Sequence, residues 1–346
     1  MPASKKSDES HGSHRAQLTI AVGLVAFGVV MFLFLRGRST LHELHVVLTD
    51  FTPARLPWLL VAGAAEVLSF WCYAMVQRRL LMEGGATLSR KSMVQLAIAA
   101  TGLTNLVPGG TAPASGWLVS QYKRRGIPVS LGLWAVLIGG VAAAIAVLLL
   151  VAVGAMIAGL LGLPWGLVCV AALGAVGVLL VLGARQGTRV GHWLDRHRPG
   201  RFDDAWKRLS SRINDASRIS ISPLSGTAVF ALSLANWGLD VVCLGAAFPF
   251  FGLAVPWKAV LFAYAVAQVA GSLAPVPGGI GFVEGGMIGA FALAGTPTGG
   301  AILATILYRI ITSFGMAACG SLMLVVLARS KRPERATLTA AAKRLR

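Results

Sequence analysis

Charged residues are scarce in this 346-residue chain, and acidic residues are the scarcest of them. Asp, Glu, Lys and Arg make up 13% of the residues, about half the quarter that is usual in soluble domains. Between residues 126 and 184, 59 consecutive residues include none of the four. A bilayer core of about 30 Å needs roughly 20 apolar residues per helical span, so this stretch has room for two spans. The scarcity excludes a soluble protein and predicts an all-α polytopic membrane protein.

Cysteines and catalytic motifs are few as well. No CxxC spacing occurs, and the cysteines lie one each in four apolar segments: Cys72, Cys169, Cys243 and Cys319. We therefore expect small buried side chains at these positions, and neither a metal nor a cofactor. There is no P-loop, G-x-S-x-G or H-E-x-x-H motif, so we do not expect ATP to drive this chain directly. An enzyme would need an unusual pair of intramembrane acids.

Basic residues are abundant, and the formal net charge is +18. They occur in short blocks between apolar segments, which is the positive-inside pattern and not a nucleic-acid-binding face. The loop 185–222 has nine Lys or Arg against four Asp and includes an amphipathic stretch, for which we expect contact with anionic headgroups. We predict a multi-pass protein of the cell (inner) membrane with cytoplasmic termini: a disordered basic tail at 1–15 and a basic tail at 329–346.

The apolar segments predict a transmembrane domain over 16–328. Six charge-poor windows are long enough for full spans: 16–35, 56–76, 131–158, 166–184, 224–248 and 300–328. Two further apolar segments, 92–122 and 258–295, are broken in the middle by proline and glycine, at 107–113 and 274–281. Basic blocks flank the first of these on both sides. We therefore interpret both as re-entrant helical hairpins, the first entering from the cytoplasm and the second from outside.

The two breaks form an internal repeat. Pro108-Gly109-Gly110 and Pro277-Gly278-Gly279 align without gaps at an offset of 169 residues. Proline and glycine stop a helix, and backbone freed at membrane depth is tolerated only where it lines a cavity. Inverted repeats with such breaks build a substrate path at the midplane. A helix restarting near Gly281 would aim N–H groups at an anion such as a lipid phosphate. The alternative is a pair of kinked structural helices.

Four ionisable residues interrupt the apolar windows, which makes each a candidate for function. They are Glu66, Asp240, Glu284 and Arg309. Counting about 1.5 Å per helical residue, all four fall in one layer near the predicted midplane. Glu284 and Arg309 are the best candidates for an ion pair, which serves either substrate or proton coupling or only the packing of neighbouring elements. Interhelical hydrogen bonding is the expected role of four weaker polar candidates: Asn105, Asn236, Gln268 and Tyr308.

Three motifs carry a resemblance to a known family. They are Asn105-Leu-Val-Pro-Gly-Gly, Pro275-Val-Pro-Gly-Gly-Ile-Gly-Phe-Val-Glu284 and Leu307-Tyr308-Arg309. Over about residues 16–328 the chain resembles the lysylphosphatidylglycerol synthase transmembrane-region family, the membrane half of multiple peptide resistance factor. The resemblance implies a flippase-type domain that moves modified phospholipids between leaflets. Residues 111–115 read Thr-Ala-Pro-Ala-Ser where many relatives carry a Gly-Glu-like stretch. Because we find no aminoacyl-transferase domain, we do not expect the chain to synthesise lysylphosphatidylglycerol.

We therefore expect a transporter of an anionic, aminoacylated or polyprenyl-linked lipid. The expected site residues are Glu284, Arg309, Gly278, Gly279, Gly281, Pro277, Pro108, Gly109, Gly110, Glu66 and Asp240. Two other interpretations stay open: a polytopic enzyme of lipid or glycan assembly, and a partner subunit of a separately encoded transferase. The apolar surface fits either a homodimer or contact with lipid.

Overall fold

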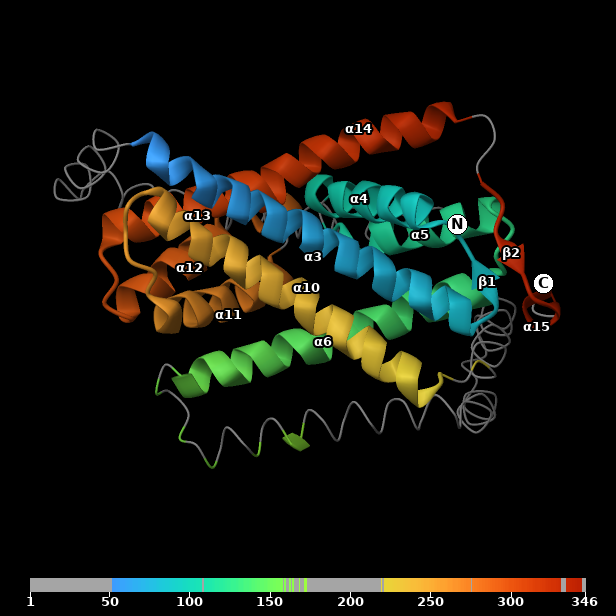
Figure 1. The fold of residues 1–346 in the computed structure, drawn as a ribbon, viewed down its shortest axis with the longest axis horizontal. Helices are drawn as coiled ribbons and strands as arrows, with labels where there is room; N and C mark the ends of the chain where they lie inside the picture. The colour runs from blue at the N-terminus through green and yellow to red at the C-terminus, as the bar shows by residue number, and fades with distance from the viewer. Residues whose placement is uncertain are drawn as a thin grey trace, which may run out of the picture. The chain divides into compact units, whose positions relative to one another are not determined.

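A computed structural model describes residues 52–107, 109–157, 219, 221–274, 276–330 and 334–343, with isolated positions between 159 and 172. Most of these residues are helical (Figure 1). The predicted span 16–35 and the tail 1–15 lie outside the described residues. The predicted span 166–184 and the loop 185–222 lie outside them too, except for single positions and the last two residues of the loop.

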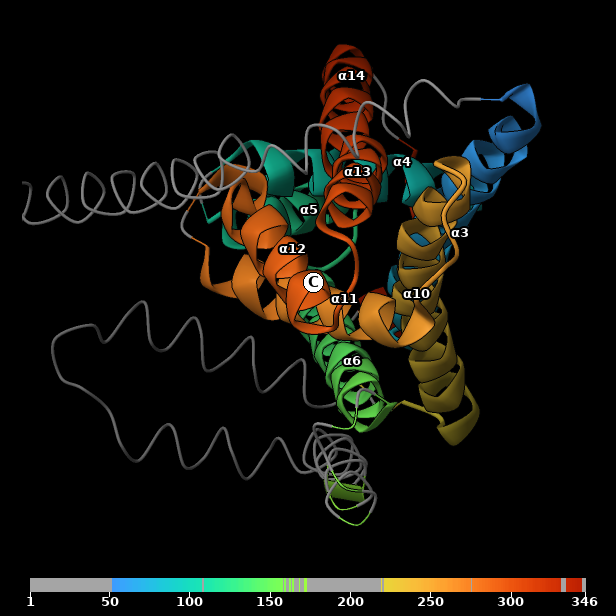
Figure 2. The same ribbon diagram turned by 90° about the vertical axis from the view of Figure 1, so that its left-hand side faces the viewer.

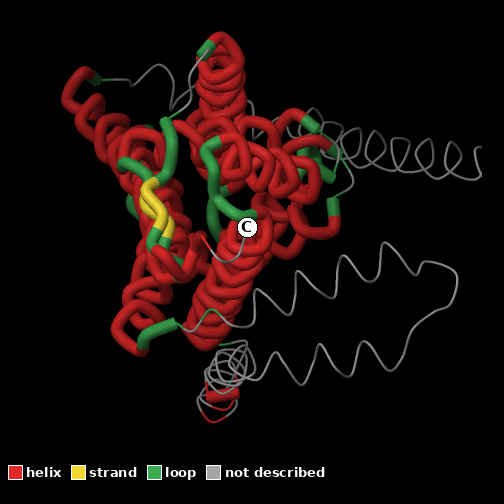
Figure 3. Tube along the Cα trace, turned by 90° about the vertical axis from the view of Figure 1, so that its right-hand side faces the viewer, coloured by secondary structure: helices red, strands yellow, loops and turns green. Residues whose placement is uncertain are grey.

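Apart from α6 and α10, which are separated by residues mostly outside the described ranges, successive helices have short connections. In chain order the elements are η1 Pro53–Arg55, α3 Leu56–Glu83, β1 Ala86–Thr87, α4 Arg90–Leu106, α5 Thr111–Arg124, α6 Val129–Ile157, α10 Pro223–Phe250, α11 Trp257–Leu273, η2 Pro277–Gly279, α12 Phe282–Leu293, α13 Thr298–Arg309, the π-helix η3 Ile310–Gly315, α14 Met316–Arg329, β2 Thr337–Leu338 and α15 Ala340–Lys343. The two short strands pair antiparallel and are drawn in yellow in Figure 3.

Four helices among the described residues are long and apolar enough to cross a membrane: Pro53–Glu83, Val129–Ile157, Pro223–Phe250 and Thr298–Arg329. They correspond to four of the six predicted spans. Helix α3 continues to Glu83, although the sequence predicts that the span ends at residue 76. Arg78 and Arg79 do not end the helix, because their side chains are hydrogen-bonded within the protein. Arg78 donates from Nε to the carbonyl of Leu88 at 3.0 Å, and Arg79 donates to Ser225 Oγ at 3.0 Å. The chain is a membrane protein.

The described residues belong to two compact units. The first comprises the described parts of Met1–Glu66, Gly102–Pro113 and Val241–Ala318. The second comprises those of Val67–Thr101, Ala114–Asp240 and Cys319–Arg346. Several helices contribute residues to both units, so the division follows packing and not the order of the chain.

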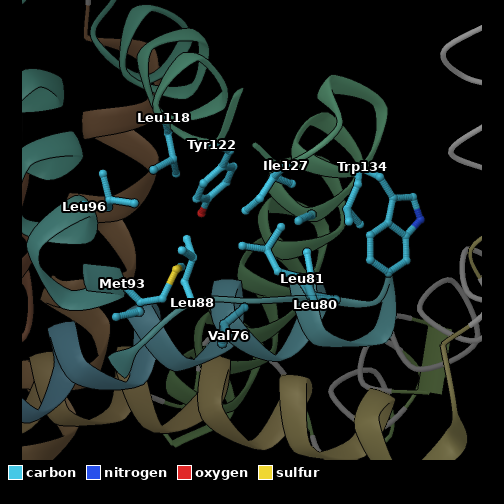
Figure 4. Close-up of a cluster of buried hydrophobic side chains, with 14 of the residues drawn as sticks. Val76, Leu80, Leu81, Leu88, Met93, Leu96, Leu118, Tyr122, Ile127 and Trp134 are labelled. Atoms are coloured by element: carbon cyan, nitrogen blue, oxygen red, sulfur yellow. The ribbon is translucent and has the colours of Figure 1, made fainter. Parts of the chain in front are cut away.

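The second unit is built on a cluster of buried apolar side chains (Figure 4). Leu80 and Leu81 of α3, Tyr122 of α5 and Leu131 of α6 are each fully buried. Glycines allow the helices to approach closely: a Cβ atom added at Gly139 would lie 2.6 Å from Nε2 of Gln77. Small residues at helix contacts are typical of membrane proteins, where packing contributes more than the exclusion of water.

Helices α3 and α10 run antiparallel in the second unit. Ser69 Oγ donates to the carbonyl oxygen and to Oδ1 of Asn236, at 2.9 and 3.2 Å. Fourteen residues later in α3, Glu83 accepts the backbone N–H of Ser222 at 3.0 Å, just before α10 begins. An increasing residue number on one helix therefore meets a decreasing number on the other. The interhelical hydrogen bond predicted for Asn236 is confirmed.

The first unit contains an antiparallel pair formed by α11 and α12, with α12 between α11 and α13 (Figures 1 and 2). A Cβ atom on Gly286 would lie 3.2 Å from the side chain of Ala270, and one on Gly279 would lie 3.5 Å from the Cα of Gly271. The rings of Phe248 and Phe291 meet edge to face at a centroid distance of 5.3 Å. Aromatic pairs in this geometry stabilise packing beyond the area that they bury.

The same series of elements occurs twice along the chain. A long helix, an interrupted pair and a second long helix are found as α3 to α6 and again as α10 to α14. Helices α4 and α11 have 17 residues each, and α6 and α13 begin 169 residues apart. Gly109 and Gly278 have φ angles of 61° and 60°, and Gly126 and Gly295 have 85° and 75°. The internal repeat predicted at the breaks thus extends to the surrounding helices.

Candidate functional site

The second interrupted pair breaks where proline and glycine forbid a continuous helix. Helix α11 ends at Leu273, and Gly278, Gly279 and Gly281 all have positive φ, a conformation that other residues rarely adopt. A side chain at Gly279 would also lie 2.8 Å from Val283. Helix α12 then begins at Phe282, with Gly281 as its N-cap. The position predicted for the restart of this helix is therefore correct.

Glu284 ties the start of α12 to the break. It occupies the third position of the helix and accepts the N–H of Gly281 through Oε2 at 2.7 Å. A carboxylate in the first turn satisfies a backbone donor that the helix leaves free, and it is stabilised by the helix dipole. The other oxygen, Oε1, accepts Arg309 Nε at 2.6 Å. The ion pair predicted between Glu284 and Arg309 is confirmed.

Arg309 is the centre of the site. It is the last residue of α13, and its side chain is only 7% exposed. Besides Glu284, the guanidinium bonds to Ser313 Oγ through Nη1 and to the carbonyl of Gly278 through Nη2, each at 2.5 Å. The planar fork of an arginine can bind three acceptors in different directions, which a lysine cannot do with the same geometry. The side chain of Arg309 thus contacts α12, the loop of the second break and the helix η3, which follows Arg309 in the chain.

A π-helix, η3, follows Arg309 directly and includes Ser313. Such turns are rare within α-helices and are often found at functional sites. Sequence reasoning missed both the π-helix and Ser313. The available signal was Thr312-Ser313, a polar pair in an otherwise apolar segment close to a predicted buried charge. Asn105 Nδ2 donates to the carbonyl of Ser313 at 3.4 Å, which confirms the interhelical bond predicted for this asparagine.

The first break lies against the same site within the first unit. Helix α4 ends at Leu106 and α5 begins at Thr111, and Pro108 between them lies outside the described residues. A Cβ atom on Gly110 would overlap the carbonyl of Thr104, 2.2 Å away, so only glycine fits there. A Cβ atom on Gly278 would lie 3.4 Å from the carbonyl oxygen of Asn105. The end of α4, just before the first break, therefore lies against the second break and against Ser313, a hydrogen-bond partner of Arg309.

The glycines of the second break use their backbone groups locally. The N–H of Gly281 donates to Glu284, that of Gly279 donates to the carbonyl of Val276 at 3.1 Å, and Gly278 presents its carbonyl to Arg309. The sequence predicts N–H donors for an anion at these positions. In the structure the positive charge of the site is that of Arg309, and Pro277 and the glycines shape the loop that holds it.

The two remaining acids lie on other helices. Glu66 is buried on α3 within the first unit, whereas Asp240 is half-buried on α10 within the second unit. The hydrogen bonds described for Arg309 are those to Glu284, Ser313 and Gly278. The single layer of four charges that the sequence predicts stays a prediction.

Comparison with known proteins agrees with these features. The sequence profile described as the lysylphosphatidylglycerol synthase TM region matches residues 18–320, which is most of the chain. No curated protein matches the chain. The match covers both interrupted pairs, Glu284 and Arg309, and it indicates a membrane protein with a lipid-related function. The chain belongs to the lysylphosphatidylglycerol synthase transmembrane-region family.

Proposed function

We propose that this protein moves a phospholipid with an anionic headgroup, aminoacylated or not, between the two leaflets of the membrane. The observation that carries the proposal is the position of Arg309. A buried guanidinium contacts the loop of one interrupted pair, in the same compact unit as the break of the other. Discontinuous helices that meet in this way are the usual site of substrate binding in membrane transporters.

The charges at the site suggest how a headgroup would be held. A phosphate oxygen of the lipid replaces Oε1 of Glu284 at Arg309 Nε, because phosphate and carboxylate accept the same charge-assisted hydrogen bond. Glu284, released from the arginine, then takes up a proton or contacts a cationic group of the headgroup. Its second oxygen keeps the N–H of Gly281, so the start of α12 stays capped during the exchange.

The repeat supports transport over a purely structural kink. Equivalent glycines, Gly109 and Gly278, adopt the same conformation, and the equivalent helices α3 and α10 run antiparallel in the second unit. Antiparallel repeats provide two similar half-structures of opposite direction, an arrangement on which many transporters build alternating access. Polar backbone at membrane depth also needs a protein-lined or water-filled cavity.

Leaflet exchange in proteoliposomes tests the proposal. Fluorescent phosphatidylglycerol is scored with an impermeant quencher, with empty liposomes as the baseline. We expect Arg309→Ala to abolish exchange and Glu284→Gln to reduce it strongly, since each removes one partner of the buried pair. Arg329→Ala is the matched control, because it removes an exposed arginine from the end of α14.

Full exchange by a folded Arg309→Ala variant would overturn this assignment. Product formation from lipids in detergent, where no second leaflet exists, would favour a polytopic enzyme instead. Wild-type exchange equal to that of empty liposomes would remove phosphatidylglycerol as a substrate, and the same assay would then be run with polyprenyl-linked lipid.

A further inference from the structure

The segment 334–343 is ordered on the second unit, although the sequence predicts only a basic tail there. It comprises Glu334, strand β2 and helix α15, and its Ala342 is fully buried. We call residues 334–343 the C-terminal clamp. All of its contacts described below are with residues of the same unit.

The clamp binds one end of the first interrupted pair at the start of α4. Glu334 accepts the backbone N–H of Ser89 at 3.0 Å, its hydroxyl at 2.7 Å, and the hydroxyl of Ser92. Ser89 precedes α4, and its own hydroxyl accepts the N–H of Ser92 at 3.2 Å. The carboxylate thus lies at the positive end of the helix and completes the capping that a serine begins.

The clamp also binds the other end of the same pair. The N–H of Ala336 donates to the carbonyl of Arg125, the residue after α5, at 2.9 Å. Strand β2, which begins at the next residue, pairs with β1, and the N–H of Thr339 donates to the carbonyl of Gly85 at 2.9 Å. Six consecutive residues, 334–339, therefore join the entry of α4 to the exit of α5.

We propose that the C-terminal clamp holds both ends of the α4–α5 pair as one mechanical element, and that Glu334 is the positioning residue that keeps it attached. Loss of Glu334 frees both ends together, although they are more than 30 residues apart in sequence. Among the described residues, Glu334 bonds to Ser89 and Ser92 at one end of the pair and Ala336 bonds to Arg125 at the other. During lipid transport, the clamp limits how far the pair moves at its ends.

Hydrogen exchange of the full-length protein in lipid nanodiscs tests this inference, and it does not depend on the proposed function. Two peptides report the two ends, one over 84–93 and one over 122–128. We expect Glu334→Ala to speed amide exchange about three- to tenfold in both peptides, because several charge-assisted hydrogen bonds are lost at once. Glu334→Gln, which keeps the shape and one acceptor, should show a smaller increase at both ends.

Two variants serve as matched controls. Arg335→Gln alters the exposed neighbour of Glu334 and should leave both peptides unchanged. Glu83→Gln alters a carboxylate that bonds in the same way to Ser222, just before α10, and to Ser225 in its first turn, and it should speed exchange in 221–230 but not in 122–128. An increase in 84–93 with no change in 122–128 would overturn the inference, as would no change in either.

The functional arm rests on the proposed lipid transport. In the exchange assay, Glu334→Ala should change the maximal rate about threefold while the lipid concentration for half-maximal rate stays the same. A structural defect at the headgroup site would change that concentration as well. If Arg309→Ala stays active, the proposed function is wrong. The hydrogen-exchange result then still shows whether the clamp holds both ends of the α4–α5 pair. If Arg309→Ala is inactive and Glu334→Ala transports normally, the clamp does not limit the movement of the α4–α5 pair during transport.

Discussion

The two interrupted pairs share their backbone and differ in their chemistry. Both break at Pro-Gly-Gly, and Gly109 and Gly278 have nearly identical φ angles. Next to the second break, Glu284 of α12 and Arg309 of α13 form an ion pair in which the arginine is buried and the carboxylate is partly buried. The residues 169 positions earlier are Ser115 and Gly140, which cannot form one. The same arrangement of helices therefore occurs twice, whereas the Glu284–Arg309 ion pair occurs in the second copy only.

The largest expected effect is a difference in the free energy of unfolding between variants at equivalent positions of the two copies. Glu284→Ala leaves the guanidinium of Arg309 buried without its carboxylate, so the free energy of unfolding should fall by about 3 kcal/mol. Ser115→Ala at the equivalent position should change it by less than about 0.5 kcal/mol. Thermal unfolding in nanodiscs measures both variants. Equal losses of stability in the two variants would mean that similar interactions hold the two breaks, and the difference between the copies would then be wrong.

The paired glycines test whether the repeat is structural, functional or both. Gly109→Ala and Gly278→Ala each place a side chain at positive φ, which costs about 1 kcal/mol, so both should destabilise the protein similarly. Only Gly278 presents its carbonyl to Arg309. We therefore expect lipid exchange to fall several-fold more in Gly278→Ala. The same loss of exchange in both variants would assign an equal role to the first break.

Ser313 gives a smaller and more specific effect. Ser313→Ala removes the hydrogen bond to Arg309 Nη1 and should cost about 1 kcal/mol, with a several-fold loss of exchange. Thr312→Ala is the control, because its hydroxyl bonds only to the carbonyl of Tyr308 in its own helix. A double variant with Glu284→Gln should lose less than the sum of the single losses, since both act through Arg309. Strict additivity would contradict that coupling.

The smallest expected effect is a pH-dependent change in the unfolding temperature, which comes from Glu334 at the start of α4. Burial raises the pKa of Glu334, but the hydrogen bonds from Ser92 and Ser89 and the charge of Arg125 outweigh it, and the pKa lies below its ordinary value of 4.5. A lowered carboxyl pKa stabilises the folded state above that ordinary value, and the stabilisation is lost as the pH falls through the folded pKa. The unfolding temperature of the wild type should therefore approach that of Glu334→Gln below about pH 4. A constant difference between the two across this range would contradict the shift.

Much of the fold was predictable because membrane helices depend on local composition. The breaks follow from proline and glycine, which act on their own backbone, and the four described spans follow from runs without charge. The Glu284–Arg309 pair was predictable as well, since buried opposite charges on neighbouring elements rarely stay apart. These features require only the identity and spacing of residues along the chain.

The features that sequence reasoning missed depend on tertiary contacts. Glu334 is a single acid in a basic tail, and nothing in the tail itself indicates that Ser89 will bind it. The use of the Gly279 and Gly281 N–H groups within the loop follows from φ angles that glycine permits but does not dictate. The π-helix likewise depends on how Arg309 and Ser313 meet, and an apolar sequence is equally compatible with a regular α-helix.

The π-helix has an evolutionary consequence. It closes each turn with one more residue than an α-helix, so a single inserted codon in an ancestral regular helix is enough to create it. The helix equivalent to α13 and α14 in the first copy, α6, is continuous from Val129 to Ile157 and keeps the regular form. Each residue of an α-helix turns it by about 100°, so one insertion re-aims every side chain on one side of it. One small change of this kind can therefore give two similar helices different side-chain orientations.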